Sequence, residues 1–160
     1  MLLVQKKDGS QRMCIDYRKL NALTKKDAYP LIEDCLERLK DAKYMSVIDL
    51  AGAYHHIPMN PESEAATAFV TQDGLYHWKV MPFGATGCPG AFQRYVDQVL
   101  RGLIGDICTA YFDDIVIYTN GDFDQHLRDL ELVLQRLRDH HLRAKLKKCH
   151  FGYDSVLFVG

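Results

Sequence analysis

The sequence lacks the features of several protein classes. No apolar run reaches the length of a membrane-spanning helix, and no signal peptide is recognisable. The five cysteines are odd in number and share no CxxC spacing, which argues against a disulfide framework or a zinc site and fits a reducing compartment. The 160 residues contain no internal repeat, low-complexity tract or linker, which indicates one domain or a piece of one.

The chain also has little excess charge, because 20 basic and 21 acidic side chains leave a net charge of -1. The charges are nevertheless unevenly distributed. Residues 1–26 hold seven basic side chains against two acidic ones, and residues 128–148 hold seven against three. Basic flanks around an acidic centre suit a protein that holds polyanions around a metal site. Taken alone, such flanks are more often ordinary solvated surfaces.

Hydrophobic periodicity and turn residues predict helices that alternate with antiparallel strand pairs. The segment 20–29 is polar and turn-like. The expected elements are a hairpin over 2–17, a helix over 31–40, a strand over 45–50, a hairpin over 66–80, a helix after Pro89, a hairpin over 107–118, a helix over 124–140 and strands over 142–146 and 156–159. This order indicates an α+β fold in which helices pack on one face of a sheet.

Two C-terminal elements carry specific expectations. The helix over 124–140 is expected to begin at Asp122 or Asp124. Its inner face is predicted from leucines at helical spacing, namely Leu127, Leu130, Leu134 and Leu137. In the segment 142–146, apolar residues alternate with basic ones, which predicts a half-buried strand with a basic outer face.

The most informative stretch is a pair of adjacent carboxylates, Asp113 and Asp114. The flanking segments 107–112 and 115–118 are apolar at nearly every position, which is typical of strands buried on both faces. Two residues between such strands fit a tight hairpin with both aspartates at its tip. Carboxylates ~4 Å apart repel by roughly 4 kcal/mol at an effective dielectric near 20, and a divalent cation relieves this repulsion. The alternative is that both aspartates simply form the turn, and the dipeptide alone favours that alternative.

Asp49 is a second candidate metal ligand, because it lies near the end of the apolar segment 45–50. Small residues and an aromatic follow it, so the backbone is expected to turn tightly there. An aspartate at the end of a buried strand could complete a metal site or could equally cap the next turn. The adjacent His55 and His56 are a weak metal signal, because neighbouring side chains diverge.

The N-terminal hairpin contains a strong turn signal at residues 8–9, Asp-Gly. A two-residue loop would place Lys7 opposite Ser10, whereas a three-residue loop would place Lys6 opposite Arg12. In either register one lysine and Arg12 project together and could clamp phosphate groups. An ordinary charged hairpin surface is the alternative.

These motifs together resemble the reverse transcriptases of gypsy-type LTR retrotransposons. Residues 111–114, Tyr-Phe-Asp-Asp, resemble the YxDD box of that family, and Asp49 resembles its other palm aspartate. Further similar segments follow in family order and spacing at 6–10, 12–21, 81–84 (Met-Pro-Phe-Gly), Pro89, 92–94 (Phe-Gln-Arg) and 147–152. The resemblance covers essentially the whole chain and is therefore more specific than any single motif.

The resemblance implies an α+β polymerase palm, an antiparallel sheet backed by helices, with part of the fingers β-hairpins and without the thumb. It implies a truncated reverse transcriptase domain over 1–160, with fingers at roughly 1–45 and 62–82 and palm at 46–61 and 83–160. The implied activity is RNA- and DNA-directed DNA synthesis, in which dNTPs are added to a primer 3'-hydroxyl. Two Mg²⁺ ions, with Mn²⁺ as a substitute, are the implied cofactors.

By the same resemblance, Asp49, Asp113 and Asp114 are the catalytic, metal-binding residues. Asp49 and Asp113 would bridge the two ions, and Asp114 would support the first. One ion would activate the primer hydroxyl, and the other would hold the triphosphate.

Four further residues correspond to nucleotide-binding positions of the family. Lys6 and Arg12 correspond to the fingers residues on the triphosphate, which favours the three-residue loop. Tyr54 corresponds to the aromatic residue that excludes a 2'-hydroxyl. Phe83 lies where retroviral relatives carry glutamine beside the nucleotide.

The implied partners are a primed RNA or DNA template, dNTPs and the remaining Pol domains (thumb and connection, RNase H and integrase), with no membrane. The implied location is intracellular, in a cytoplasmic virus-like particle and the nucleus. The alternative is a non-catalytic or degenerate nucleic-acid-binding remnant, because Phe112 and residues 51–53 depart from the usual family pattern. The chain stops inside a predicted strand, and without a thumb it is expected to be weak or inactive alone.

Overall fold

The computed structural model describes residues 2–5, 9, 11–25, 32–156 and 158. The chain divides into two compact units, and each is described by itself. Unit 1 consists of Met1–Asp27 and Tyr54–Ala91, and unit 2 consists of Ala28–Ala53 and Phe92–Gly160. All five cysteines are free. Within the described ranges, no helix has both the length and the apolar character needed to cross a membrane.

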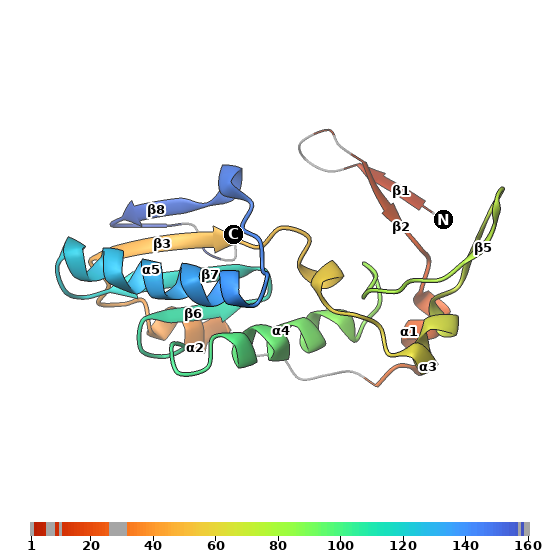
Figure 1. Cartoon of the computed structure of the whole chain (residues 1–160), viewed down its shortest axis with the longest axis horizontal. Coiled ribbons are helices and arrows are strands. Elements are labelled where there is room, and N and C mark those ends of the chain that lie inside the picture. Colours follow the sequence, from red (N-terminus) through yellow and green to blue (C-terminus); the bar gives the residue numbers. More distant parts are fainter. Residues whose placement is uncertain (1, 6–8, 10, 26–31, 157, 159–160) are drawn as a thin grey trace. The chain divides into compact units, whose positions relative to one another are not determined.

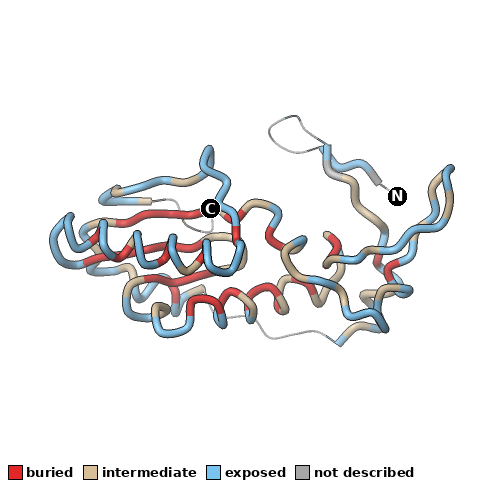
Figure 2. The backbone as a smooth tube through the Cα atoms, viewed as in Figure 1, coloured by how far each residue is buried: buried red, intermediate tan, exposed pale blue. Residues whose placement is uncertain are grey.

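The core of unit 2 is a four-stranded antiparallel sheet in the order β6-β7-β3-β8 (Figure 1). Its strands are β3 (Tyr44–Asp49), β6 (Cys108–Tyr111), β7 (Asp114–Thr119) and β8 (His150–Tyr153). The central strands β3 and β7 are buried along most of their length (Figure 2). Ile48, Ile115 and Val116 are fully inaccessible to solvent. The segments predicted as buried strands, 107–112 and 115–118, correspond to β6 and β7, and most residues of both strands are buried.

Three helices accompany this sheet. They are α2 (Ile32–Glu37), α4 (Cys88–Val99), of which the part from Phe92 belongs to unit 2, and α5 (Phe123–Asp139). The side chain of Asp122 accepts a hydrogen bond from the backbone N–H of Gln125, so Asp122 is the N-cap of α5. Helix α5 packs across β7 and β3 (Figure 1). The antiparallel sheet with packed helices confirms the α+β class.

The sheet face away from α5 is covered by loop segments. Ser46 contacts α5, so its neighbours on β3, Met45 and Val47, point to the opposite face. There they form a cluster with Val116 and Tyr118 of β7. Partly buried Leu39, Ala42, Val156 and Phe158 pack against this cluster. Both faces of the sheet are thus covered, which explains why its central strands are apolar at nearly every position.

The buried face of α5 differs from the predicted one. Leu127 and Leu134 are 47% and 39% exposed, respectively. The buried residues are Leu137, as predicted, and three that were not predicted, namely His126, Asp129 and Val133. Hydrophobic periodicity was misleading here because two polar residues are buried through hydrogen bonds, which the pattern of leucines does not show.

These two polar residues belong to a buried hydrogen-bond network between α5 and the sheet. Thr119 Oγ1 donates to Asp129 Oδ2 at 2.7 Å and lies 3.0 Å from His126 Nδ1. Because the single hydroxyl proton of Thr119 is used on Asp129, Nδ1 of His126 donates and Nε2 accepts from Ser46 Oγ at 2.8 Å. The backbone N–H of Gly152 in turn donates to Ser46 Oγ at 3.0 Å. The network thus joins β3, β7 and β8 to α5 and contains a neutral histidine.

We expect the free energy of unfolding to fall as the pH drops below about 6.5, the ordinary pKa of histidine. Burial lowers the pKa of His126 in the folded protein. The unfolded chain therefore binds more protons in this pH range, and stability that is complete above it is lost on acidification. Denaturant unfolding at pH 7.5 and 5.5 measures the effect.

The variant His126→Asn should be about 1–3 kcal/mol less stable at pH 7.5, because it disrupts the buried network. It should also lose less stability on acidification than the parent. The matched control is His140→Asn, since His140 is exposed at the C-terminal end of α5. Equal acid sensitivity of the parent and His126→Asn would show that another group is responsible.

The segment 142–146 does not form the predicted strand. Ala144 makes only an isolated bridge with Leu50, and Leu146–Lys148 form a 3₁₀ turn, η3. The side chain of Leu146 is 74% exposed. The alternation of apolar and basic residues did not suffice to form a strand, because a strand needs a hydrogen-bonded partner along its length. The neighbouring strand β3 ends at Asp49 and offers no such partner.

Unit 1 is built from short elements. They are β1 (Leu2–Gln5), β2 (Gln11–Cys14), α1 (Arg18–Leu23), η1 (Ala53–His56), α3 (Pro61–Glu64), η2 (Ala65–Thr67), β4 (Phe69–Thr71) and β5 (Gly74–Tyr76). Helix α1 occupies part of the segment predicted to be turn-like, so that prediction is wrong over residues 20–23. The side chain of Asn21 donates to Gly84 O and accepts from Thr86 N, each at 2.8 Å. Asn21 thus makes tertiary contacts, which a residue in a surface turn would not need.

The register of the β1–β2 hairpin differs from both predicted registers. Val4 pairs with Arg12, and Gln5 pairs with Gln11. The expected pairing of Lys6 with Arg12 is therefore wrong, and Lys6 itself lies outside the described residues. Gly9 has a φ of 79°, as a tight turn requires. The Asp-Gly signal located the bend, but pairing between the strands set the register.

Candidate functional site

The turn between β6 and β7 lies one residue earlier than predicted. Tyr111 pairs with Asp114, so the two turn residues are Phe112 and Asp113. Phe112 has a φ of 53°, in the left-handed region that non-glycine residues seldom adopt. Of the two aspartates, only Asp113 therefore lies in the turn, and Asp114 is the first residue of β7.

This shift places Asp114 directly opposite Asp49, the last residue of β3. Side chains of directly paired residues in antiparallel strands lie on the same face, with Cβ atoms roughly 5 Å apart. The backbone N–H of Leu50 also donates to the carbonyl oxygen of Asp113 at 2.9 Å. The structure thus brings Asp49, Asp113 and Asp114 together at one end of the unit 2 sheet.

Charge repulsion is concentrated at this end of the sheet. The pKa of Asp114 is raised, first by burial and then by the negative charges of Asp49 and Asp113. A raised pKa means that the folded protein disfavours the ionised form of this carboxyl group. Ionised Asp114 therefore lowers the stability of the fold. A cation at this site would offset the repulsion.

Lys148, the last residue of η3, supplies a positive charge to this cluster. Its Nζ lies 2.6 Å from Oδ2 of Asp49. The hydrogen bond to Asp49 raises the pKa of Lys148, and the charges of Asp114 and Asp113 raise it further. Sequence reasoning missed this residue because three lysines occur within residues 145–148, and only the folded backbone determines which one reaches Asp49.

The carboxylate oxygens of the three aspartates are suitable ligands for a divalent cation. In this conformation, however, the three side chains do not point to a common position. Across the described part of the chain, no three His, Cys, Asp or Glu side chains gather closely enough to hold a metal ion. Mg²⁺ prefers carboxylate oxygens together with substrate phosphates and water. The ammonium group of Lys148 shows that Asp49 already attracts a cation. Binding of an ion by all three aspartates would therefore require side-chain rotation.

Gln93 on α4 holds the hairpin in place and was not predicted as a site residue. Its side chain is 3% exposed. Its Oε1 accepts from the backbone N–H of Phe112 at 2.7 Å. Its Nε2 donates to Ala110 O at 3.1 Å and to Asp97 Oδ1 at 2.9 Å. Gln93 therefore fixes the backbone on both sides of Tyr111, where the left-handed residue Phe112 needs support.

The residues predicted to bind the nucleotide belong to unit 1. Tyr54 lies on η1, and its ring centroid is 5.2 Å from that of Phe83. His55 makes an edge contact with Phe83 at 5.0 Å. Arg12 lies on β2, and Lys6 is outside the described residues. The structure therefore brings Tyr54 and Phe83 together.

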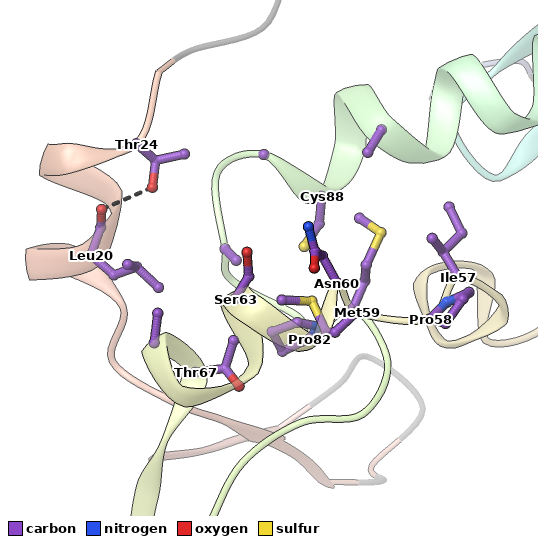
Figure 3. A pocket seen from close by; sticks show the side chains of 15 residues that line it. Leu20, Thr24, Ile57, Pro58, Met59, Asn60, Ser63, Thr67, Pro82 and Cys88 are labelled. Atoms are coloured by element: carbon purple, nitrogen blue, oxygen red, sulfur yellow. Dashed lines mark hydrogen bonds between the residues drawn. The ribbon is translucent and has the colours of Figure 1, made fainter.

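Unit 1 also contains a largely apolar pocket of about 470 Å³ (Figure 3). Leu20, Ile57, Met59, Pro82 and Cys88 are among its lining residues. Burial raises the pKa of the Cys88 thiol to about 11, so the thiol stays protonated at neutral pH. No charged side chain of the described residues lines the pocket, so the pocket is unsuited to a triphosphate.

Comparison with protein families identifies similarity over nearly the whole chain. The model of the family "Reverse transcriptase (RNA-dependent DNA polymerase)" matches residues 4–160. The Pol polyprotein of transposon 297 from Drosophila melanogaster is 40% identical over 93% of this chain. The Pol polyprotein of transposon gypsy from the same organism is 37% identical over 94% of the chain. The chain spans only 14% and 15% of these two relatives, respectively.

Solved structures show the same similarity. A foamy viral protease–reverse transcriptase in complex with double-stranded DNA superimposes with a TM-score of 0.89 at 30% identity. The match covers 99% of this chain and 28% of that protein. The corresponding foamy viral complex with an RNA/DNA hybrid has a TM-score of 0.87 at 29% identity, and 21% of its chain is covered.

Proposed function

The chain belongs to the reverse transcriptase (RNA-dependent DNA polymerase) family, and on this basis we propose that it is the fingers and palm part of a gypsy-type retrotransposon polymerase. In this proposal the intact enzyme adds dNTPs to the 3'-hydroxyl of a primer. The observation that carries the proposal is the direct pairing of Asp49 with Asp114 beside Asp113. Fingers would comprise roughly 1–45 and 62–82, and palm 46–61 and 83–160.

We infer that Asp49, Asp113 and Asp114 hold divalent ions, which this family uses in catalysis. Mg²⁺ is the proposed ion, with Mn²⁺ as a substitute, because both accept carboxylate oxygens. When bound, such ions activate the attacking hydroxyl and stabilise the leaving group. Asp49 and Asp113 would bridge the ions, and Asp114 would support the first.

The proposed nucleotide-binding residues have separate tasks. Arg12 and Lys6 would contact the triphosphate, to which a guanidinium group can donate two parallel hydrogen bonds. Tyr54 would close the pocket beneath the sugar and exclude a 2'-hydroxyl. Phe83 would lie beside the nucleotide, and its contact with Tyr54 supports a shared role.

Replacing Tyr54 by Val is expected to weaken discrimination against ribonucleotides by about tenfold or more, because the added space accommodates a hydroxyl. The measurement is the ratio of kcat/KM for dNTP and rNTP in single-nucleotide extension by a longer form of the protein. Tyr76→Val is the matched control, because Tyr76 lies exposed on β5. If the ratio of kcat/KM for dNTP and rNTP is unchanged in Tyr54→Val, Tyr54 does not exclude the 2'-hydroxyl and the proposed role is wrong.

We propose that the natural partners are a primed RNA or DNA template, dNTPs and the other domains of the Pol polyprotein. The foamy viral complexes with double-stranded DNA and with an RNA/DNA hybrid support this choice of template. The polyprotein relatives support the choice of neighbouring domains. An intracellular site of action, within a cytoplasmic virus-like particle and in the nucleus, completes the proposal.

Primer extension tests the proposed function. A longer protein that continues into the rest of the polyprotein should extend a DNA primer on RNA and DNA templates with Mg²⁺, and EDTA should stop the reaction. The alternative is a non-catalytic or degenerate nucleic-acid-binding remnant. Binding of primed template without any extension, with either Mg²⁺ or Mn²⁺, would establish that alternative.

A further inference from the structure

We propose that Lys148 is a built-in counter-ion of the aspartate cluster: its ammonium group occupies Asp49 in the absence of metal and is displaced when a divalent ion binds. This inference rests on the proposed function, because it takes the three aspartates as the ion ligands. It assigns to Lys148 control over how tightly the site binds its ion.

The contact itself has the geometry of a displaceable ion pair. Nζ of Lys148 lies 2.6 Å from Oδ2 of Asp49, whose side chain is only 15% exposed. The side chain of Lys148 is 57% exposed. The carboxylate therefore has little access to water, whereas the ammonium group can leave it for solvent without being buried elsewhere.

The backbone around Lys148 is tied to the end of β3. The N–H of Lys145 donates to Asp49 O at 2.8 Å, and the N–H of Lys148 donates to Lys145 O at 2.8 Å. Ala144 also forms a bridge with Leu50. These contacts keep the origin of the Lys148 side chain beside the aspartates, so displacement requires only rotation of its long, flexible stem.

The charges of the cluster give Lys148 two opposite effects. It offsets the repulsion among Asp49, Asp113 and Asp114, and thereby stabilises the fold without metal. The same charge competes with a divalent ion for Asp49 and repels the ion at close range. A purely structural ion pair would show the first effect without the second.

Binding of Mn²⁺ to the 160-residue chain tests this inference. The electron paramagnetic resonance signal of free Mn²⁺ gives the dissociation constant without nucleotide or catalysis. Lys148→Met should bind Mn²⁺ about five-fold more tightly, the size expected for loss of a partly exposed charge. Lys148→Arg keeps the charge and should bind like the parent. The matched control Lys147→Met removes a neighbouring exposed lysine of η3 and should also bind like the parent.

Thermal unfolding followed by circular dichroism provides the second readout. Without metal, Lys148→Met should have a lower Tm than the parent, because the aspartates lose their counter-ion. Saturating Mn²⁺ should reduce the difference in Tm between the two proteins. If Lys148→Met does not fold, Lys148→Gln is the neutral variant to measure in its place. Unchanged or weaker Mn²⁺ binding by the neutral variant would overturn the inference.

Asp49→Asn separates this inference from the proposed function. If Asp49→Asn leaves Mn²⁺ binding unchanged, the proposed ion site is wrong, and the role of Lys148 falls with it. If Asp49→Asn weakens binding while neutral variants of Lys148 leave it unchanged, only the counter-ion role is wrong. Weaker binding by Asp49→Asn together with tighter binding by Lys148→Met supports both.

Discussion

Replacing Asp113 by Asn in a primer-extending form of the protein is expected to lower the extension rate at least about a thousandfold, or about 4 kcal/mol of activation free energy. Asparagine keeps the size of the side chain but removes the charge proposed to bridge the ions. The hydrogen bond from Leu50 to the backbone carbonyl of residue 113 does not depend on the side chain. The fold should therefore remain intact while activity is lost.

Rapid-quench measurement of single-nucleotide incorporation, together with circular dichroism, checks this expectation. The matched control is Asp73→Asn, because Asp73 is an exposed turn residue between β4 and β5. It should extend primers at the rate of the parent. Unchanged extension by Asp113→Asn would falsify the assignment of the aspartate cluster as the polymerase centre.

Replacing Gln93 by Leu is expected to lower the free energy of unfolding by about 3 kcal/mol, because buried backbone groups lose their partners. These groups are the N–H of Phe112 and the carbonyl of Ala110. Leucine has a similar volume, so the loss reflects hydrogen bonds more than packing. Extension should also slow by about tenfold or more, since displacement of a catalytic group by about 1 Å can cost up to 10²-fold.

Urea denaturation and single-nucleotide incorporation measure the two effects. Gln135→Leu is the matched control, because Gln135 is exposed on α5 and its hydrogen bonds among the described residues lie within that helix. Its stability should lie within about 0.5 kcal/mol of the parent. If Gln93→Leu is as stable and as active as this control, Gln93 does not hold the catalytic turn.

The sequence was most informative where local pattern and burial coincide. The apolar runs before and after Asp113 and Asp114 predicted two adjacent buried strands, and the structure confirms them as β6 and β7. Asp122 was one of two predicted caps and is the N-cap of α5. Family motifs spaced along the whole chain indicated the reverse transcriptase family, which the family model confirms over residues 4–160.

The errors share a cause, which is that strand register and helix orientation depend on distant partners. The turn after Tyr111 was misplaced by one residue, because two carboxylates look like turn residues until Asp114 is paired with Asp49. The inner face of α5 was assigned to leucines, because the polar partners that allow burial of His126 and Asp129 lie on other elements: Ser46 on β3 and Thr119 on β7.

The amino-acid sequence by itself determined the class of fold and the position of most strands, because short-range periodicity and composition are sufficient for these features. The three aspartates proposed for catalysis were indicated by the resemblance of the sequence to a family. Only the tertiary structure decided that Asp49 faces Asp114, that Gln93 supports the turn and that Lys148 rather than Lys147 reaches the cluster. These are contacts between residues up to 99 positions apart. Such contacts arise from strand pairing and side-chain packing, which no local pattern specifies.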